Sequence, residues 1–123
     1  MSMIDHYFST ASATTYYGSV RLRAYEMIKE LRTSLGEDQN KAEEVFKKLW
    51  NGYREIVYGT NCFSELLVEI FENENDPKRL EKAKQLAGLM KKNGVVFHVK
   101  YKIEEYREKG NRELAGQFAE LIK

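Results

Sequence analysis

The chain has 123 residues, of which 42% are hydrophobic and 32% are charged, with a single proline and eight glycines. Its 20 basic and 19 acidic residues give a net charge of +1, which leaves room for a local basic patch but argues against a strongly electrostatic nucleic-acid binder. Cys62 is the only cysteine, so an internal disulfide is excluded, and together with two distant histidines it cannot build a structural zinc site. We therefore expect one domain that holds no metal and no cofactor.

The sequence contains no apolar run of the roughly 18 residues that a membrane span needs. Its first residues also lack the basic start and apolar centre of a secretory signal. We expect an intracellular, cytoplasmic protein without membrane contact. Residues 1–25 carry one acid, Asp5, among many serines and threonines, and this leaves an organellar location open.

Residues 1–18 are rich in serine, threonine, alanine and tyrosine and show no helical spacing of apolar side chains. This composition predicts an irregular N-terminal arm, followed by a helical domain over residues 19–123. The aromatic side chains of the arm suggest packing against its own bundle or against a partner, and the candidate partner-binding residues are Tyr7, Phe8, Tyr16 and Tyr17. A partly mobile terminus is the alternative.

Apolar residues recur at helical spacing through the rest of the chain and predict an all-α fold. About six helices are expected, over residues 19–35, 38–58, 61–74, 77–93, 95–109 and 111–123. Their expected starts are Ser19, Asp38 or Asn40, Asn61, the pair Asp76-Pro77, and Asn111. The second helix has the most regular apolar stripe and should form the core, although Gly52 could end or kink it. The helices should form three antiparallel hairpins that stack, because such pairs cannot bury their apolar faces alone.

Residues 95–103 fit two patterns. Val95, Phe97, Val99, Tyr101 and Ile103 alternate with polar residues, which is typical of a strand. The same segment also continues a helical face towards Gly110. We favour the helix because its neighbours are helical, and a strand here would need a partner from the N-terminal arm.

A short pattern recurs around three alanines. Lys41-Ala42-Glu-Glu-Val-Phe46, Lys82-Ala83-Lys-Gln-Leu86 and Leu114-Ala115-Gly-Gln-Phe118 share an alanine, two polar or small residues and a large apolar residue. The segment Met90-Lys-Lys-Asn-Gly94 follows the second copy, and the segment Tyr106-Arg-Glu-Lys-Gly110 precedes the third. In these features the chain resembles pentatricopeptide repeats, and next to them tetratricopeptide repeats. The resemblance implies stacked helical hairpins. The Pro-Asp usual between pentatricopeptide repeats is missing after Gly94, so no base-reading residue is assigned from it.

No Ser/His/Asp set, metal-ligand spacing or glycine-rich phosphate loop occurs, and we expect no enzymatic activity. Cys62 lies at a predicted helix start, where a lowered thiol pKa is one interpretation and a small semi-buried apolar residue is the other. In a stack of helical hairpins, the first helices of all the hairpins line one common face of the stack. This face could carry a strip of basic residues, with tyrosines on which bases stack. Glu65 and Glu69 would interrupt this strip, whose candidate nucleic-acid-binding residues are Arg21, Arg23, Tyr25, His98, Lys100, Tyr101 and Lys102.

These observations predict a non-enzymatic helical interaction protein, an adaptor or a small subunit of a larger assembly. A protein partner or a homo-oligomer is expected. The alternative is a helical-repeat protein that binds single-stranded RNA through the basic strip.

Overall fold

The computed structural model describes residues 3–12 and 14–123, and most of these residues lie in α-helices. The helices are α1 (Met3–Ser9), α2 (Tyr16–Ser34), α3 (Gln39–Gly52), α4 (Arg54–Gly59), α5 (Cys62–Phe71), α6 (Arg79–Lys92), α7 (Tyr101–Glu108) and α8 (Arg112–Leu121). The prediction of an all-α fold is confirmed. The described ranges hold eight helices rather than six, since α1 and α4 come from segments assigned to the arm and to the second helix.

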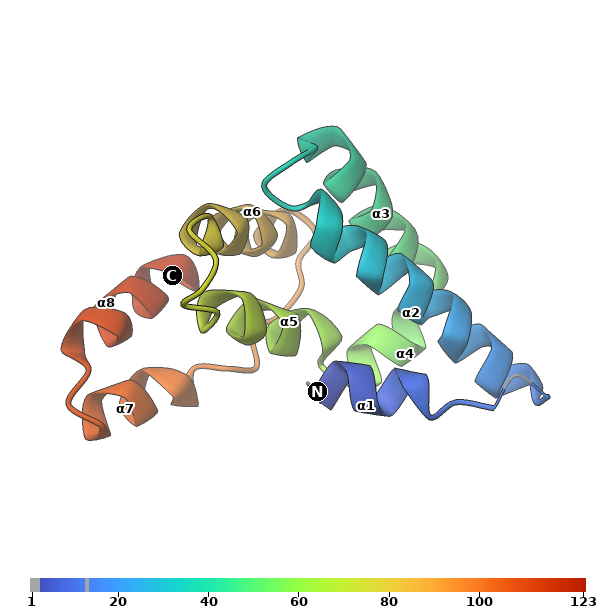
Figure 1. Cartoon of the computed structure of the whole chain (residues 1–123), viewed down its shortest axis with the longest axis horizontal. Helices are drawn as coiled ribbons and strands as arrows, with labels where there is room; N and C mark the ends of the chain where they lie inside the picture. The colour runs from blue at the N-terminus through green and yellow to red at the C-terminus, as the bar shows by residue number, and fades with distance from the viewer. Residues whose placement is uncertain (1–2, 13) are drawn as a thin grey trace.

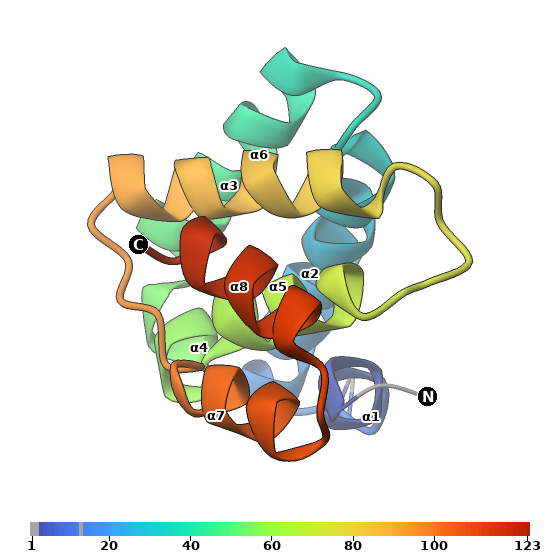
Figure 2. The same ribbon diagram turned by 90° about the vertical axis from the view of Figure 1, so that its left-hand side faces the viewer.

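The helices that pack most closely are neighbours along the chain: α2 with α3, α5 with α6, and α7 with α8. Figure 1 shows these pairs following one another along the long axis of the molecule, from α2 and α3 at one end to α7 and α8 at the other. The helix α1 lies against α2 and α5, and α6 contacts both α3 and α8. In the end-on view of Figure 2, α6 and α8 lie next to each other. The middle pair therefore connects the two ends.

The N-terminal residues do not form the irregular arm that the composition predicted. Residues Met3–Ser9 form α1, in which Ile4 and Phe8, one turn apart, both enter the hydrophobic core. The helix α2 begins at Tyr16, earlier than the predicted residue 19, because the hydroxyl of Thr15 accepts a hydrogen bond from the backbone of Gly18 at 2.9 Å. Met1, Ser2 and Ala13 of the predicted arm lie outside the described residues.

The predicted second helix is divided in two. Asp38, one of the two expected caps, directly precedes α3, and its side chain accepts a hydrogen bond from the amide of Lys41 at 3.0 Å. The helix ends after Gly52, where Tyr53 has φ −130° and ψ 32°, outside helical values. The short α4 then places Ile56 and Val57 in the core.

The segment between α6 and α7 settles the ambiguity at residues 95–103. No strand occurs in the described part of the chain, and α7 begins only at Tyr101, so the favoured helix over residues 95–109 is wrong for residues 95–100. Residues 95–99 are extended, and the hydroxyl of Ser64 in α5 holds them: it accepts from the amide of His98 at 3.1 Å and donates to the carbonyl of Val96 at 3.4 Å. Val99 is buried, whereas Val96 and His98 are exposed. The alternating pattern therefore belongs to an extended segment packed on one side, without a neighbouring strand.

Aromatic side chains join the pairs of helices. Phe46 of α3 stacks on Phe63 of α5 with ring centroids 4.1 Å apart. Phe71 of α5, Tyr106 of α7 and Phe118 of α8 form a second cluster, with centroids 5.1 to 5.9 Å apart. These rings are buried, so each junction adds directional ring contacts to the burial of apolar surface.

Polar contacts fix α6 on the first pair. The side-chain oxygen of Gln85 accepts a hydrogen bond from the amide of Gly36 at 2.7 Å, in the turn between α2 and α3 where Gly36 has φ +78°. Lys92, the last residue of α6, pairs with Glu43 of α3 at 3.0 Å. None of the helices in the described ranges is both long and apolar enough to cross a membrane.

Candidate interaction surfaces

The four predicted partner-binding aromatics lie in different environments. Phe8 is fully buried and stacks on the ring of Tyr25, so it contributes to the core of this chain. Tyr7 is half-buried, and its hydroxyl is 3.2 Å from that of Tyr17. Tyr16 and Tyr17 are 86% and 55% exposed, so these two remain accessible to a partner.

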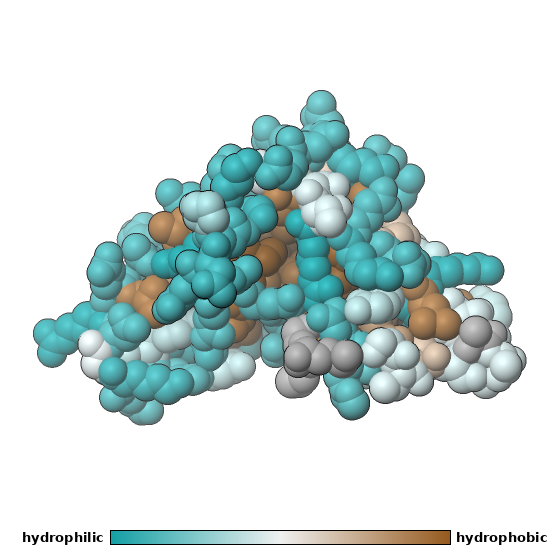
Figure 3. Space-filling view, viewed as in Figure 1, coloured by the Kyte–Doolittle hydropathy of each residue, from teal (hydrophilic) through white to brown (hydrophobic). Residues whose placement is uncertain are grey.

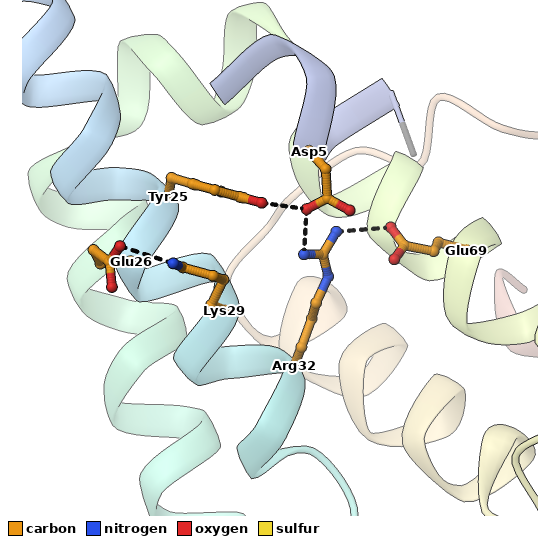
Figure 4. A network of polar contacts seen from close by, with 6 residues as sticks. All are labelled: Asp5, Tyr25, Glu26, Lys29, Arg32 and Glu69. Atoms are coloured by element: carbon orange, nitrogen blue, oxygen red, sulfur yellow. Dashed lines mark hydrogen bonds and ion pairs between the residues drawn. The ribbon is translucent and has the colours of Figure 1, made fainter. Parts of the chain in front are cut away.

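A polar network ties α1 to the bundle (Figure 4). Arg32 of α2 donates to Asp5 of α1 at 2.7 Å and to Glu69 of α5 at 3.0 Å. The hydroxyl of Tyr25 donates to the same oxygen of Asp5 at 2.7 Å, and this hydrogen bond raises the pKa of Tyr25 because it needs the phenolic proton. Two residues from the predicted sites, Tyr25 and Phe8, thus hold the N-terminal helix in place.

The predicted basic strip is divided into two groups. Arg21, Arg23 and Tyr25 lie in the first half of α2. His98 and Lys100 directly precede α7, and Tyr101 and Lys102 begin it, towards the other end of the long axis (Figure 1). The guanidinium of Arg21 donates to the carbonyl of Tyr7 and lies 4.1 Å from the centre of its ring. Hence the structure does not bring the seven residues together, and Arg23 is the more exposed arginine of the α2 group.

The second group of the predicted strip, here called the α7 group (His98, Lys100, Tyr101 and Lys102), includes one lysine that is paired within the chain. Lys102 is mostly buried and pairs with Glu72 at 3.2 Å and with Glu105 at 3.1 Å. His98, Lys100 and Tyr101 are exposed. The amphipathic pattern around Lys102 could not show that a glutamate at the end of α5 would meet it.

Sequence reasoning missed an aromatic neighbour of this group. Tyr58 of α4 is 61% exposed and meets His98 edge-on, with ring centroids 6.3 Å apart. Arg54, on the same short helix, lies over the ring of Trp50 at 4.4 Å. The helical spacing of Trp50, Arg54 and Tyr58 across the break at Tyr53 was the signal for such a patch.

A groove between α6 and α8 is a further feature that sequence reasoning did not identify. Its space is about 600 Å³. One wall is a single face of α6, since its residues follow helical spacing: Leu80, Lys84, Ala87, Gly88 and Lys91. The other wall comes from α8: Gln117, Glu120 and Leu121.

The surface of the groove combines an apolar floor with charged rims. Ala87 and Leu121 are nearly buried and form part of the floor. Lys84 and Lys91 of α6 are exposed and pair with no described residue, whereas Lys82 and Lys92 of the same helix are held by Asp76 and Glu43. The α8 rim carries Glu120. In Figure 3, small hydrophobic areas show among hydrophilic side chains over α6 and α8.

Two further features of the groove concern Gln117 and Gly88. The Oε1 atom of Gln117 is buried and accepts no hydrogen bond from the described residues. Gly88 lies in the middle of α6, where glycine destabilises a helix by about 1 kcal/mol relative to alanine. A Cβ atom at Gly88 would meet nothing within 4 Å, so internal packing does not require glycine there.

Cys62 is a core residue. It is fully buried at the start of α5, and burial raises the pKa of its thiol to about 12. The interpretation as an activated thiol is therefore wrong, because the thiolate is strongly disfavoured in this apolar site. No group of three His, Cys, Asp or Glu side chains in the described ranges is arranged to hold a metal ion.

We expect Cys62 in the folded protein to react with iodoacetamide at pH 8 at least about 100-fold more slowly than an unfolded cysteine, since the thiolate is the reacting species. Mass spectrometry of the labelled protein with and without urea measures this ratio. Equal labelling rates in both states would contradict the buried position of Cys62.

Comparison with protein-family models, curated proteins and solved structures finds no match to this chain.

Proposed function

We propose that this protein is a non-enzymatic helical interaction protein, an adaptor or small subunit that binds a protein partner in the groove between α6 and α8. The observation that carries the proposal is the groove itself, about 600 Å³ of space with an apolar floor and two lysines that pair with no described residue. Burial of this floor would supply affinity, and the charged rims would orient the partner. The order of the packed helix pairs also supports the helical-hairpin interpretation.

The shape of the groove favours a helix as the bound element. The wall on α6 extends over the 12 residues from Leu80 to Lys91, a length of about 16 Å for 11 steps of 1.5 Å. A helix that lies in a groove of this length presents apolar side chains over about three turns. The exposed glycine in the middle of the wall gives such a helix room to approach the backbone of α6.

Single-stranded RNA binding remains the second candidate, and one observation favours it. Tyr58, His98 and Tyr101 are exposed aromatic side chains, and Lys100 lies between the last two in sequence. Aromatic rings beside a cation are the elements on which bases of a single strand stack. This candidate uses the α7 group of the predicted strip and a surface other than the groove.

A photo-cross-linking experiment separates the two candidates. A lysine analogue that carries a diazirine and keeps its positive charge replaces Lys84 in the groove or, as the matched control, the exposed Lys100 at the start of α7. Each variant is illuminated in the native host, and the products are identified by mass spectrometry. We expect a discrete protein adduct from position 84 and none of comparable yield from position 100.

Three other results would contradict the proposal. An RNA adduct from position 100 alone would favour the RNA candidate. Equal adducts from both positions would indicate random collisions, and the absence of any adduct from position 84 would remove the groove as a binding surface.

A further inference from the structure

The two walls of the groove carry charges of opposite sign. The α6 wall presents Lys84 and Lys91, which are exposed and pair with no described residue. The α8 wall presents Glu120, which is also exposed and whose one ion-pair neighbour among the described residues is Lys123 at 3.8 Å. The apolar floor lies between these walls. A helix in the groove therefore meets positive charge on one flank and negative charge on the other.

This arrangement disfavours a helix whose two flanks have the same sign. An acidic helix would pair with Lys84 and Lys91 but would bring carboxylates beside Glu120, and a basic helix would pair with Glu120 but repel both lysines. Repulsion of this kind is stronger beside an apolar floor from which the bound helix displaces water, because the local dielectric constant falls. The matching helix has acidic side chains towards α6 and basic side chains towards α8.

The spacing of the two lysines sets the spacing of the acidic side chains. Lys84 and Lys91 are seven residues apart, which is two turns and about 10 Å along α6. Two acidic residues seven apart on a helix that runs beside α6 have the same separation, so both ion pairs can form together. Gly88 lies on the same face between the lysines, and without a side chain there an apolar residue of the partner can reach the backbone of α6.

The charges also select the direction of the bound helix. Turning an amphipathic helix end to end, with its apolar face kept on the floor, exchanges its two flanks. One direction then places the acidic flank beside α6, and the other direction places it beside Glu120. The groove therefore requires flanks of opposite sign, and a helix with either arrangement of flanks satisfies this requirement in one of the two directions.

From these features we infer that the groove between α6 and α8 binds an amphipathic partner helix with flanks of opposite charge, in which two acidic residues seven apart face Lys84 and Lys91 and a basic residue faces Glu120. This inference rests on the proposed function, because it states the chemistry of the partner.

Three synthetic helices test the inference on the purified chain at about 50 mM salt, where screening of charges is weak. They share one apolar face and a covalent staple on the opposite side, which keeps such short peptides helical. The mixed-flank helix has two glutamates seven apart on one flank and two arginines seven apart on the other. The other two helices have glutamates on both flanks or arginines on both flanks. Fluorescence anisotropy measures each Kd, and we expect the mixed-flank helix to bind about tenfold more tightly than either of the others.

Charge substitutions in the groove should change this order of affinities. Glu120→Lys makes both walls positive, so the helix with glutamates on both flanks should become the tightest ligand. Lys84→Glu/Lys91→Glu makes both walls negative and should favour arginines on both flanks. The matched control is Glu108→Lys, which changes the net charge as Glu120→Lys does, but at the exposed end of α7 outside the groove. This control should keep the order of the unmodified chain.

Three results would overturn the inference. The first is the same change of order for Glu120→Lys and Glu108→Lys, because net charge alone would then explain it. The second is equal affinity of the three helices for the unmodified chain. The third is the absence of binding by any of them up to about 100 µM helix.

Cross-linking from position 84 separates failure of this inference from failure of the proposed function. A protein adduct from position 84, without a preference for the mixed-flank helix, would leave the docking function standing and contradict the stated chemistry of the partner. The absence of both the adduct and the preference would contradict both proposals. An adduct on a helix with flanks of opposite charge, together with the preference, supports both.

Discussion

Replacing Phe46 with alanine is expected to lower the free energy of unfolding by about 3–5 kcal/mol. The side chain is fully buried in α3 and stacks on Phe63 of α5 with ring centroids 4.1 Å apart, so the change removes both apolar burial and a ring contact. The junction between the first two helix pairs would be left with a cavity. Urea unfolding followed by circular dichroism measures the loss.

The neighbouring Lys47 gives the control for Phe46. Its side chain is 47% exposed, and Lys47→Ala should change the stability by no more than about 0.5 kcal/mol. If Phe46→Ala does not fold, Phe46→Leu leaves a smaller cavity and should show an intermediate loss. Equal stability of the Phe46 and Lys47 variants would show that α3 does not meet α5 as described.

Replacing Arg32 with methionine is expected to lower the free energy of unfolding by about 2 kcal/mol and to release α1. Methionine keeps the apolar stem but loses the hydrogen bonds to Asp5 and Glu69, which leaves two partly buried carboxylates without their shared cation. The value allows for solvent screening, since the Arg32 and Asp5 side chains are 21% and 24% exposed. Amide hydrogen exchange in α1 should accelerate more than exchange in α8.

The exposed pair of Glu26 and Lys29, also drawn in Figure 4, provides the matched control. Lys29→Met removes an ion pair on the same helix, one turn from Arg32, and should leave both the unfolding midpoint and the exchange of α1 nearly unchanged. The same exchange rates in α1 for both variants would contradict the role of Arg32.

The N-terminal helix α1 shows why the local sequence pattern was insufficient to predict every helix. The helix α1 has seven residues, and Ile4 and Phe8 are the two that reach the core. A helix this short is unstable alone, so it depends on Arg32 and Tyr25, which are 27 and 20 residues distant from Asp5. Those contacts exist only in the folded chain, which is why composition predicted an irregular arm.

The extended segment before α7 shows a pattern that was informative but incompletely interpreted. The helix was favoured at residues 95–99 over the alternating pattern, but there Val99 is buried while Val96 and His98 are exposed, as alternation implies. The alternation could not tell a strand from an extended segment, because the difference depends on whether another strand lies beside it. Here the hydroxyl of Ser64 occupies part of that position.

The groove between α6 and α8 could not be predicted from the sequence, because it too depends on contacts that form only in the folded chain. Lysines on a helix normally indicate a solvated face, and the sequence does not distinguish Lys84 and Lys91 from Lys82 and Lys92. The fold distinguishes them. It places Asp76 beside Lys82 and Glu43 beside Lys92, and it leaves the other two lysines in the groove that faces α8. Helical spacing could identify the α6 face, but only tertiary structure brings Gln117 and Glu120 opposite to it.

The central claim, that the groove between α6 and α8 is the docking surface, is tested most directly by the cross-linking yields from positions 84 and 100. We predict a discrete protein adduct from position 84 at a yield about tenfold or more above that from position 100, which corresponds to preferential occupancy of the groove. An adduct from position 100 without one from position 84 would contradict the claim and would move the binding surface to the start of α7.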